Sequence, residues 1–274
     1  MPRTDDSKRD NRSKSRLANR LERIRVRFHN SFLASGFTSV FYDQNLVESC
    51  GTSVPSRAAI GDHLCTIFAD LMASCPSLIV ELGTRGGEST RTILAAARHL
   101  RATLLSIDLN PCGDIGLSPN LRERWTFVQA DDVDFGKRGF VPWCAAQGIE
   151  PSIHAMFIDT SHHYEHTARE IETWFPYVAA NGIILFHDTN MGQLYRRLNN
   201  TLGRGWDNDR GVIRAIEEYL DRSFDETKTF VDVADEWLVR HYPYSSGLTL
   251  LKKLALPDRV AGREGHPTSG EGRR

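Results

Sequence analysis

Five short apolar runs, separated by segments with helical periodicity, constrain the fold of this 274-residue chain more than any other feature. The runs are Leu78–Leu82, Thr103–Ile107, Trp125–Gln129, Ile153–Ile158 and Gly182–Phe186. Helices are predicted between them, at Ser89–Leu100 and Glu165–Val178. Strands that alternate with helices form βαβ units, so the pattern predicts a parallel sheet that is buried on both faces.

Three later segments complete the predicted domain. Gly211–Leu220 has the pattern of an amphipathic helix, and Thr229–Val233 and Gly247–Leu251 read as two further strands. The predicted fold class is therefore α/β, doubly wound, with a mostly parallel seven-stranded sheet at 76–256.

The segments outside this domain differ in composition. Residues 1–15 and the Gly-, Pro-, Arg- and Glu-rich residues 257–274 are expected to be disordered tails. Residues 16–75 are expected to form an N-terminal helical extension, which includes a helix at Ala58–Cys75 and a basic amphipathic helix from Arg16. Such a basic helix can bind an anionic membrane, but it more often packs its apolar stripe on its own domain.

Charge and cysteine content exclude several classes of protein. The formal net charge of -1 gives no indication of nucleic-acid binding. No apolar run approaches the ~20 residues that a membrane span needs, and a secretory signal is not evident. The five cysteines are scattered without metal-binding or disulfide spacing, which is typical of reduced thiols in a cytoplasmic protein.

A glycine-rich turn, Glu81-Leu-Gly83-Thr-Arg-Gly86-Gly87, joins the first apolar run to its helix. Glycines there let the chain bend sharply and let a ligand approach the backbone closely. Asp108 ends the next run, 25 residues after Gly83. An acid at that point can accept hydrogen bonds from both ribose hydroxyls. The turn and the aspartate together predict a ligand that contains adenosine.

The spacing of the turn indicates which adenosine ligand fits. A dinucleotide fingerprint, G-x-G-x-x-G, needs glycine at position 85, where this chain has Arg85. Glu81 suits the cationic amino group and sulfonium of S-adenosylmethionine and would do little for a pyrophosphate. Asp131 and Asp132 follow the third run, where an acid can contact adenine. The predicted ligand is S-adenosylmethionine.

On these residues the chain resembles the class I S-adenosylmethionine-dependent methyltransferases, and among them the small-molecule and sugar O-methyltransferases of natural-product pathways. The matching stretches are VELGTRGGEST, LLSIDLN, FVQADD and MFIDTSHHYEHTAREIETWFPYVAANGIILFHDT. The last is the most specific, because its strand ending in Asp, its His and Tyr, its helix and its strand ending in His-Asp recur together in that subgroup. The resemblance covers roughly Pro76 to Lys253.

The resemblance implies a Rossmann-like catalytic domain and a role for each matching residue. The implied cofactor-binding residues, from the methionine end to the adenine end, are Glu81, Gly83 and Gly87, then Asp108 at the ribose, and Asp131 or Asp132 at the adenine. Asp159 would lie beside the methyl group. The N-terminal helices would form a lid or a dimer contact over the site of the methyl acceptor, a homo-oligomer in the second case.

The resemblance also implies a metal site. Metal-dependent relatives hold magnesium with an acid at the Asp159 position and with acids or an amide after the fifth strand, where this chain has His187 and Asp188. The expected ligands of Mg²⁺ are therefore Asp159 and Asp188. Two positions depart from the pattern: Ser161 stands where many relatives have a second acid, and His187 stands where they have an oxygen ligand.

The chemistry of methyl transfer points to the same residues. A hydroxyl is a poor nucleophile until it loses its proton, which a bound cation or a histidine base can promote. Asp159 and Asp188 end two strands that are expected to be neighbours and could share a magnesium ion. His162 is the expected base, with His163 and His187 as competitors.

The predicted function is S-adenosylmethionine-dependent methylation of a small-molecule or sugar hydroxyl, with phenols and amines also open as acceptors. A nicotinamide-dependent oxidoreductase is an alternative that Arg85 disfavours. A non-catalytic adenosine-binding protein on the same fold is the other alternative, since a fold alone does not establish a reaction.

Overall fold

The computed structural model describes residues 59–191, 194–196, 202–204 and 210–255, all of which belong to one compact unit. The tails expected at 1–15 and 257–274 and the basic helix from Arg16 lie outside these described residues.

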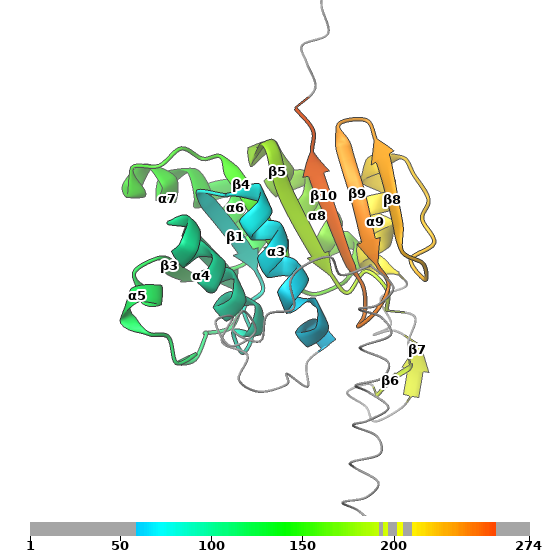
Figure 1. Ribbon diagram of the computed structural model, residues 1–274, viewed down its shortest axis with the longest axis horizontal. Coiled ribbons are helices and arrows are strands. Elements are labelled where there is room, and N and C mark those ends of the chain that lie inside the picture. Colours follow the sequence, from blue (N-terminus) through cyan, green and yellow to red (C-terminus); the bar gives the residue numbers. More distant parts are fainter. Residues whose placement is uncertain (1–58, 192–193, 197–201, 205–209, 256–274) are drawn as a thin grey trace, which may run out of the picture. The chain divides into compact units, whose positions relative to one another are not determined.

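Eight strands of the described part form one sheet, in the order β3-β2-β1-β4-β5-β10-β9-β8 (Figure 1). The parallel strands are β1 (Leu78–Leu82), β2 (Thr103–Asp108), β3 (Trp125–Gln129), β4 (Ile153–Ile158) and β5 (Val178–His187). The antiparallel strands are β8 (Phe230–Ala234), β9 (Trp237–Tyr242) and β10 (Leu248–Lys253). A separate antiparallel pair is formed by β6 (Leu194–Arg196) and β7 (Leu202–Arg204). The predicted doubly wound α/β class is confirmed.

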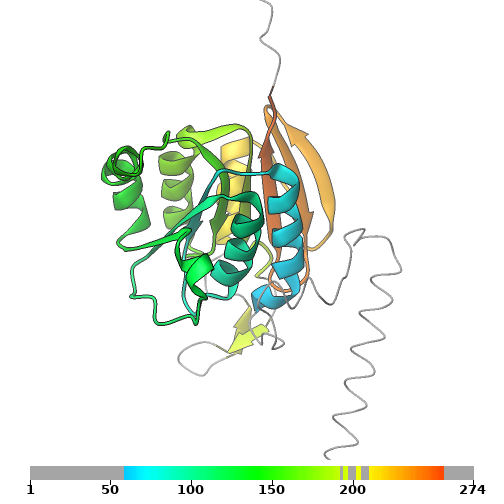
Figure 2. The same cartoon turned by 60° about the vertical axis from the view of Figure 1, so that its left-hand side comes forward.

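Helices cover both faces of the sheet (Figure 1, Figure 2). On one face lie α3 (Leu64–Ser74) and α4 (Glu88–Leu100), and on the other lie α6 (Asp132–Arg138), α8 (Tyr164–Trp174) and α9 (Gly211–Leu220). The shorter elements are η1 (Ala59–His63), α5 (Pro119–Arg122), α7 (Phe140–Gln147) and η2 (Phe175–Tyr177).

The core follows from this layering. Every residue of β1 is buried, as expected for a strand covered by helices on both sides. On the face of α8, the fully buried Trp174 packs edge-on against Phe140, with 5.2 Å between ring centroids. Gly136 of α6 lets the two helices approach, since a Cβ there would lie 2.5 Å from Thr173 and 2.9 Å from Trp174.

Two predicted elements need correction. The helix predicted at Glu165–Val178 ends at Trp174, because Pro176 cannot continue a helical hydrogen-bond ladder and a 3₁₀ turn follows. The sheet has eight strands rather than seven, since β9 was not predicted. Arg240 and His241 make the sequence of β9 look polar, but the structure pairs Arg240 with Asp70 and places His241 2.8 Å from the Thr249 hydroxyl.

Part of the segment expected as an extension belongs to the sheet's own helical layer. Ile67 and Leu71 of α3 are fully buried, and Arg240 of β9 donates to Asp70 of the same helix.

The four described cysteines, Cys65, Cys75, Cys112 and Cys144, are free thiols. Among the described residues, none of the helices combines the length and the apolar character that crossing a bilayer requires.

A buried carboxylate ties the first strands to α4. Glu81 of β1 has no exposed surface and accepts hydrogen bonds from Ser89 (2.6 Å), Thr90 (2.9 Å) and Ser106 (2.5 Å). The Ser106 hydroxyl in turn accepts from the indole N–H of Trp125, 2.9 Å away. Burial raises the pKa of Glu81 to about 7, although the three hydroxyl donors partly oppose the shift.

The raised pKa predicts a pH-dependent contribution of Glu81 to stability. The folded state binds this proton more tightly than the unfolded chain, so the contribution is complete at low pH and is lost between about pH 4.5 and 7. The loss is at most about 3.5 kcal/mol at ~1.4 kcal/mol per pKa unit. Denaturant unfolding from pH 5 to 8 should show a smaller fall in unfolding free energy for Glu81→Gln than for the wild type.

Glu123→Gln, at an exposed position of the same half of the sheet, is the control and should keep the wild-type slope. Parallel pH profiles of the wild type and Glu81→Gln would contradict the assignment of this proton to Glu81.

Candidate active site

The predicted site residues gather at the carboxyl ends of three adjacent strands. The glycine-rich turn follows β1, Asp159 follows β4 and Asp188 follows β5, and β4 pairs with both other strands. The strand order reverses between β1 and β4, which is where doubly wound sheets bind their ligands.

Gly83 is required by the contact between β1 and β4. It has φ +87°, and its N–H donates to the Ile107 carbonyl 2.9 Å away. A Cβ at Gly83 would lie 2.1 Å from the carbonyl oxygen of Asp159. The sequence predicts that this glycine leaves room for a ligand, but the Asp159 backbone occupies the space that a side chain would fill. A role of Gly83 along the cofactor stays a prediction.

Gly87 closes the turn and starts α4. It has φ +76°, and its N–H donates to the Thr84 carbonyl at 2.8 Å. A Cβ there would lie 2.7 Å from the side chain of Ile115, so the loop after β2 packs directly on this glycine.

Asp108 is hydrogen-bonded to the glycine turn, and its predicted contact with a ribose stays a prediction. One carboxylate oxygen accepts hydrogen bonds from the N–H groups of Thr84 (2.8 Å) and Arg85 (3.1 Å), and the other accepts from the N–H of Asn110 (2.8 Å). The side chain is half-buried. The acid predicted to hold the ribose therefore lies beside the glycine turn. Glu81 lies beneath the turn with its carboxylate enclosed by hydroxyl groups, and its contact with a methionine moiety stays a prediction.

The two candidates for the adenine end have separate surroundings. Asp131 is the N-cap of α6 and accepts a hydrogen bond from the Asp134 N–H at 2.8 Å. Asp132 is only 5% exposed and lies 3.1 Å from His166 Nε2. Hydrogen bonds to Asp132 and Glu170 raise the pKa of His166 to about 10. The structure leaves the role of either aspartate at the adenine as a prediction.

Glu170 connects this second cluster to the residue after Asp159. It is fully buried and accepts a hydrogen bond from the Thr160 hydroxyl at 2.7 Å. Burial raises the pKa of Glu170 to about 8. The loop that carries Thr160 and His162 is thus tied to α8 from beneath.

Asp159, His162 and Asp188 form the central cluster. His162 Nε2 lies 3.1 Å from a carboxylate oxygen of Asp188. One potential ligand atom from each of the three residues lies within 4.8 Å of the others. The structure therefore brings together the predicted base and both predicted metal ligands, which are separated by up to 29 positions in the sequence.

His187 contributes a positive charge to this cluster. Its Nδ1 lies 3.2 Å from Asp159 and 3.4 Å from Asp188, and the side chain is 4% exposed. Burial alone would lower the pKa of His187, but the negative charge and hydrogen bond of Asp159 outweigh it and raise the pKa to about 10. His187 is protonated at neutral pH and acts as a donor. His163 makes no side-chain hydrogen bond or ion pair within the described residues.

Helix α9 packs against the loop between β4 and α8, a contact that the sequence analysis did not predict. His162 has φ +60°, and a Cβ at Gly211, the first residue of α9, would lie 2.4 Å from the His162 carbonyl oxygen. The Arg214 guanidinium lies 3.8 Å from the centre of the Tyr164 ring, and the Tyr164 hydroxyl donates to Glu218. The spacing of Tyr164 from α9 is too long for any local pattern to indicate these contacts.

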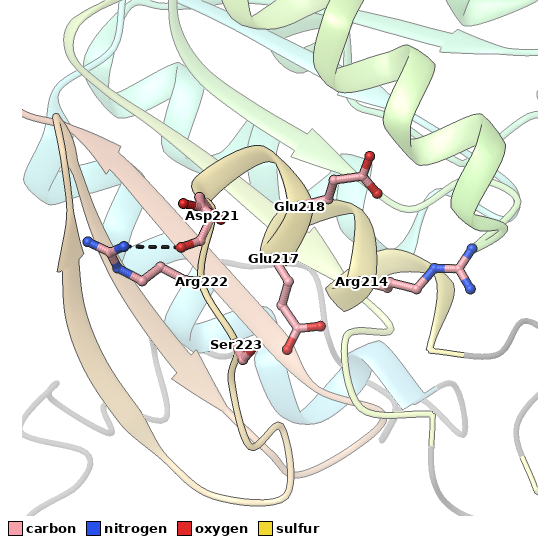
Figure 3. Close-up of a pocket in the computed structure, with 6 residues that line it drawn as sticks. All are labelled: Arg214, Glu217, Glu218, Asp221, Arg222 and Ser223. Atoms are coloured by element: carbon pink, nitrogen blue, oxygen red, sulfur yellow. Dashed lines mark hydrogen bonds between the residues drawn. The ribbon is translucent and has the colours of Figure 1, made fainter.

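A surface pocket on the outer side of α9 is separate from this cluster. It is lined by Arg214, Glu217, Glu218, Asp221, Arg222 and Ser223 (Figure 3). None of the residues in the central cluster lines it, and its charged lining shows no arrangement of nucleophile and base.

Comparisons with known proteins agree with this geometry. Residues 80–189 match the model of a methyltransferase domain. Among curated proteins, none matches the sequence. A cofactor-bound protein from MTB superposes with a TM-score of 0.51 at 16% identity, over 82% of this chain and 95% of that one. A protein from Corynebacterium glutamicum gives a TM-score of 0.50 at 14% identity, over 84% and 99%.

These structural likenesses establish the fold, and the matched domain contains the glycine turn, Asp108 and the whole central cluster. The domain match favours the methyltransferase over the oxidoreductase alternative. Residues 80–189 are therefore identified as a methyltransferase domain, and the described part of the chain has the Rossmann-like fold that the resemblance implies.

Proposed function

We propose that this methyltransferase methylates a hydroxyl group of a small molecule or sugar, and that the cluster of Asp159, His162 and Asp188 removes the hydroxyl proton. The supporting observation is the position of an Asp–His pair at the ends of β4 and β5, directly beside the turn that follows β1. Methyl transfer from the cofactor needs a positioned acceptor and a proton acceptor, and this edge of the sheet offers both.

The cofactor would lie over the glycine turn. Asp108 would accept hydrogen bonds from its ribose, since the carboxylate is half-buried beside the turn and retains acceptor capacity. When bound, S-adenosylmethionine supplies a methyl group whose bond to sulfur breaks as a bond to the acceptor oxygen forms, with the electron pair left on sulfur.

His162 would take the acceptor's proton. Its Nε2 lies 3.1 Å from an Asp188 oxygen, so a neutral ring with its proton on Nε2 facing this carboxylate would leave the lone pair of Nδ1 to accept a proton. The Asp188 carboxylate holds this tautomer and stabilises the imidazolium that results. Asp159 receives a hydrogen bond from the protonated His187, which orients it without consuming both oxygens.

We also propose Asp159 and Asp188 as ligands of a divalent cation. Two carboxylates whose oxygens lie near one another are the donors that Mg²⁺ prefers, so these residues fit magnesium in kind. When bound, such a cation lowers the pKa of the acceptor hydroxyl. The nitrogen of His162 suits magnesium less well, which favours its assignment as the base.

The proposed roles of the cation and of the His162 base can be tested by measuring turnover. The assay follows the release of S-adenosylhomocysteine in the presence of a panel of sugar, phenol and amine acceptors. We expect chelation to abolish turnover and magnesium to restore it. His162→Ala should lower kcat ~100- to 10,000-fold, the usual contribution of a positioned base. Asp159→Asn and Asp188→Asn should weaken the dependence on magnesium and lower kcat.

His163→Ala is the matched control and should keep most of the activity, because this exposed neighbour lies outside the cluster. Activity that resists chelation but is lost in His162→Ala would leave a metal-free base mechanism. Full activity in all three cluster variants would disprove the catalytic assignment.

The cofactor site makes a separate prediction that needs no acceptor. Asp108→Ala should weaken binding of S-adenosylmethionine by ~1.5–3 kcal/mol, or roughly 10- to 100-fold, because charge-assisted hydrogen bonds are lost. Calorimetric titration measures this effect. Asp225→Ala, which removes an exposed carboxylate paired with Lys228 in the turn before β8, should bind the cofactor like the wild type. Equal affinities of all three proteins would remove Asp108 from the site.

A further inference from the structure

A second cluster of acidic and histidine side chains lies apart from the central cluster and shares no residue with it. Asp132, His166 and Glu170 each offer one ligand atom, and these three atoms lie within 4.8 Å of one another. His166 and Glu170 stand four positions apart on α8, a spacing that puts both side chains on one face of the helix. Asp132 is the first residue of α6, which packs on α8. The cluster therefore spans two helices on the same face of the sheet.

The atoms of this cluster have the spacing of ligands around one metal ion. His166 Nε2 lies 3.1 Å from an oxygen of Asp132 and 3.4 Å from an oxygen of Glu170. Ligand atoms that lie about 2.1 Å from a zinc ion in tetrahedral directions are roughly 3.4 Å from one another. A single ion could therefore replace the proton between these groups with only small movements of the side chains.

One buried carboxylate oxygen of the cluster lacks a donor. Glu170 has no exposed surface, and its Oε1 accepts a hydrogen bond from the Thr160 hydroxyl at 2.7 Å. Its Oε2 is buried and has no hydrogen-bond partner. A buried carboxylate oxygen of this kind requires a proton or a cation. Burial raises the pKa of Glu170 to about 8, and the nearby Asp132 carboxylate adds to the rise, although His166 opposes it. A proton meets the requirement when no cation is bound.

The donor set favours zinc over magnesium. Zinc binds both imidazole nitrogen and carboxylate oxygen, whereas magnesium prefers oxygen ligands. Outer hydrogen bonds already orient both acids, as they do in metal sites. The Val133 N–H donates to Asp132 at 2.8 Å, and the Thr160 hydroxyl donates to the second acid. The His166 side chain is 15% exposed and the two acids are less exposed, so an ion can enter from the His166 side.

We propose that Asp132, His166 and Glu170 bind a zinc ion that joins α6 to α8. His166 supplies Nε2 and each acid supplies one oxygen, which leaves a fourth position for water. Zinc at Nε2 moves the ring proton to Nδ1, where the exposed guanidinium of Arg169 lies 3.4 Å away and can turn toward solvent. The ion is a structural link and takes no part in methyl transfer. Asp132 is then committed to the metal, which leaves Asp131 as the candidate at the adenine.

Calorimetric titration of the metal-free, full-length chain with zinc chloride tests the proposal. The background is Asp159→Asn/Asp188→Asn, which lacks both proposed magnesium ligands. We expect this protein to bind a single zinc ion that millimolar magnesium does not displace. His166→Ala in this background should weaken zinc binding at least ~100-fold, because losing a direct ligand costs more than the about 10- to 100-fold that is typical of an outer partner.

The same ion should stabilise the fold. At a zinc concentration ~100 times Kd, the melting temperature should rise by about 5 to 10 °C, and His166→Ala should abolish the rise. His163→Ala and Glu172→Gln are the matched controls, because both residues are exposed and lie at or on α8 outside the cluster. Both control variants should bind zinc as the background does.

X-ray absorption of bound zinc provides a readout that does not depend on substituting buried acids. His162→Ala removes the histidine of the central cluster and leaves all four acids in place. Zinc bound to this variant should have one imidazole ligand, and the added substitution His166→Gln should remove it. Both substituted histidines are only partly buried, so these variants should fold.

Three results would overturn the proposal. If the background protein binds no zinc, protons alone hold the cluster together. If zinc affinity survives His166→Ala, the ion lies elsewhere, at cysteines or surface histidines. An absorption spectrum of the His162→Ala protein without an imidazole ligand would exclude His166 from the site. The proposed catalytic cation is tested separately by turnover, so its assignment survives each of these results.

Discussion

The close contact between Gly83 and the Asp159 carbonyl group sets the relation between the two halves of the site. A Cβ would come within 2.1 Å of that oxygen, so any side chain at position 83 would force the ends of β1 and β4 apart. The turn after β1 carries residues of the proposed cofactor site, and the residues after β4 carry the proposed base and one of the proposed metal ligands. A misplacement of about 1 Å between reacting groups can cost roughly 100-fold in rate, so a backbone contact that holds these two segments together would matter for the proposed transfer.

Two clusters of acidic and histidine side chains, one buried and one partly buried, flank the loop after β4. In one cluster Asp159 and Asp188 lie beside His187 and His162, and in the other Asp132 and Glu170 lie beside His166. Buried charges persist only when they are paired, and removing one partner leaves the other uncompensated. Thr160 joins the second cluster through Glu170, one position after Asp159. The loop after β4 is therefore held by the hydrogen bonds and ion pairs of these two clusters and by its contacts with α9. Contacts between neighbouring residues of the loop contribute less.

Local patterns predicted the fold and the cofactor motif well, because their signals are contained in single segments. The apolar runs predicted β1 to β5, and the place of Asp108 at the end of β2 followed from the length of the second run. Strand β9 was missed because Arg240 and His241 obtain their partners from α3 and β10, far away in the chain. The need for glycine at position 211 could not be predicted for the same reason. The His162 carbonyl, which Gly211 approaches closely, lies 49 residues earlier in the sequence.

The candidate site likewise combines residues from inside and from outside the matched methyltransferase domain. The matched methyltransferase domain, residues 80–189, contains the turn, Asp108 and the central cluster. The residues that enclose His187 come from elsewhere: His63 precedes α3 and faces His187 edge-on with 5.6 Å between ring centroids, and Tyr244 precedes β10 and stacks on His63. Gly211 and Tyr164 bring α9 against the catalytic loop. The matched domain contains the proposed cofactor-binding residues and the proposed base, whereas His63, Gly211 and Tyr244 lie outside it. A match of this domain does not carry the identity of the acceptor with it.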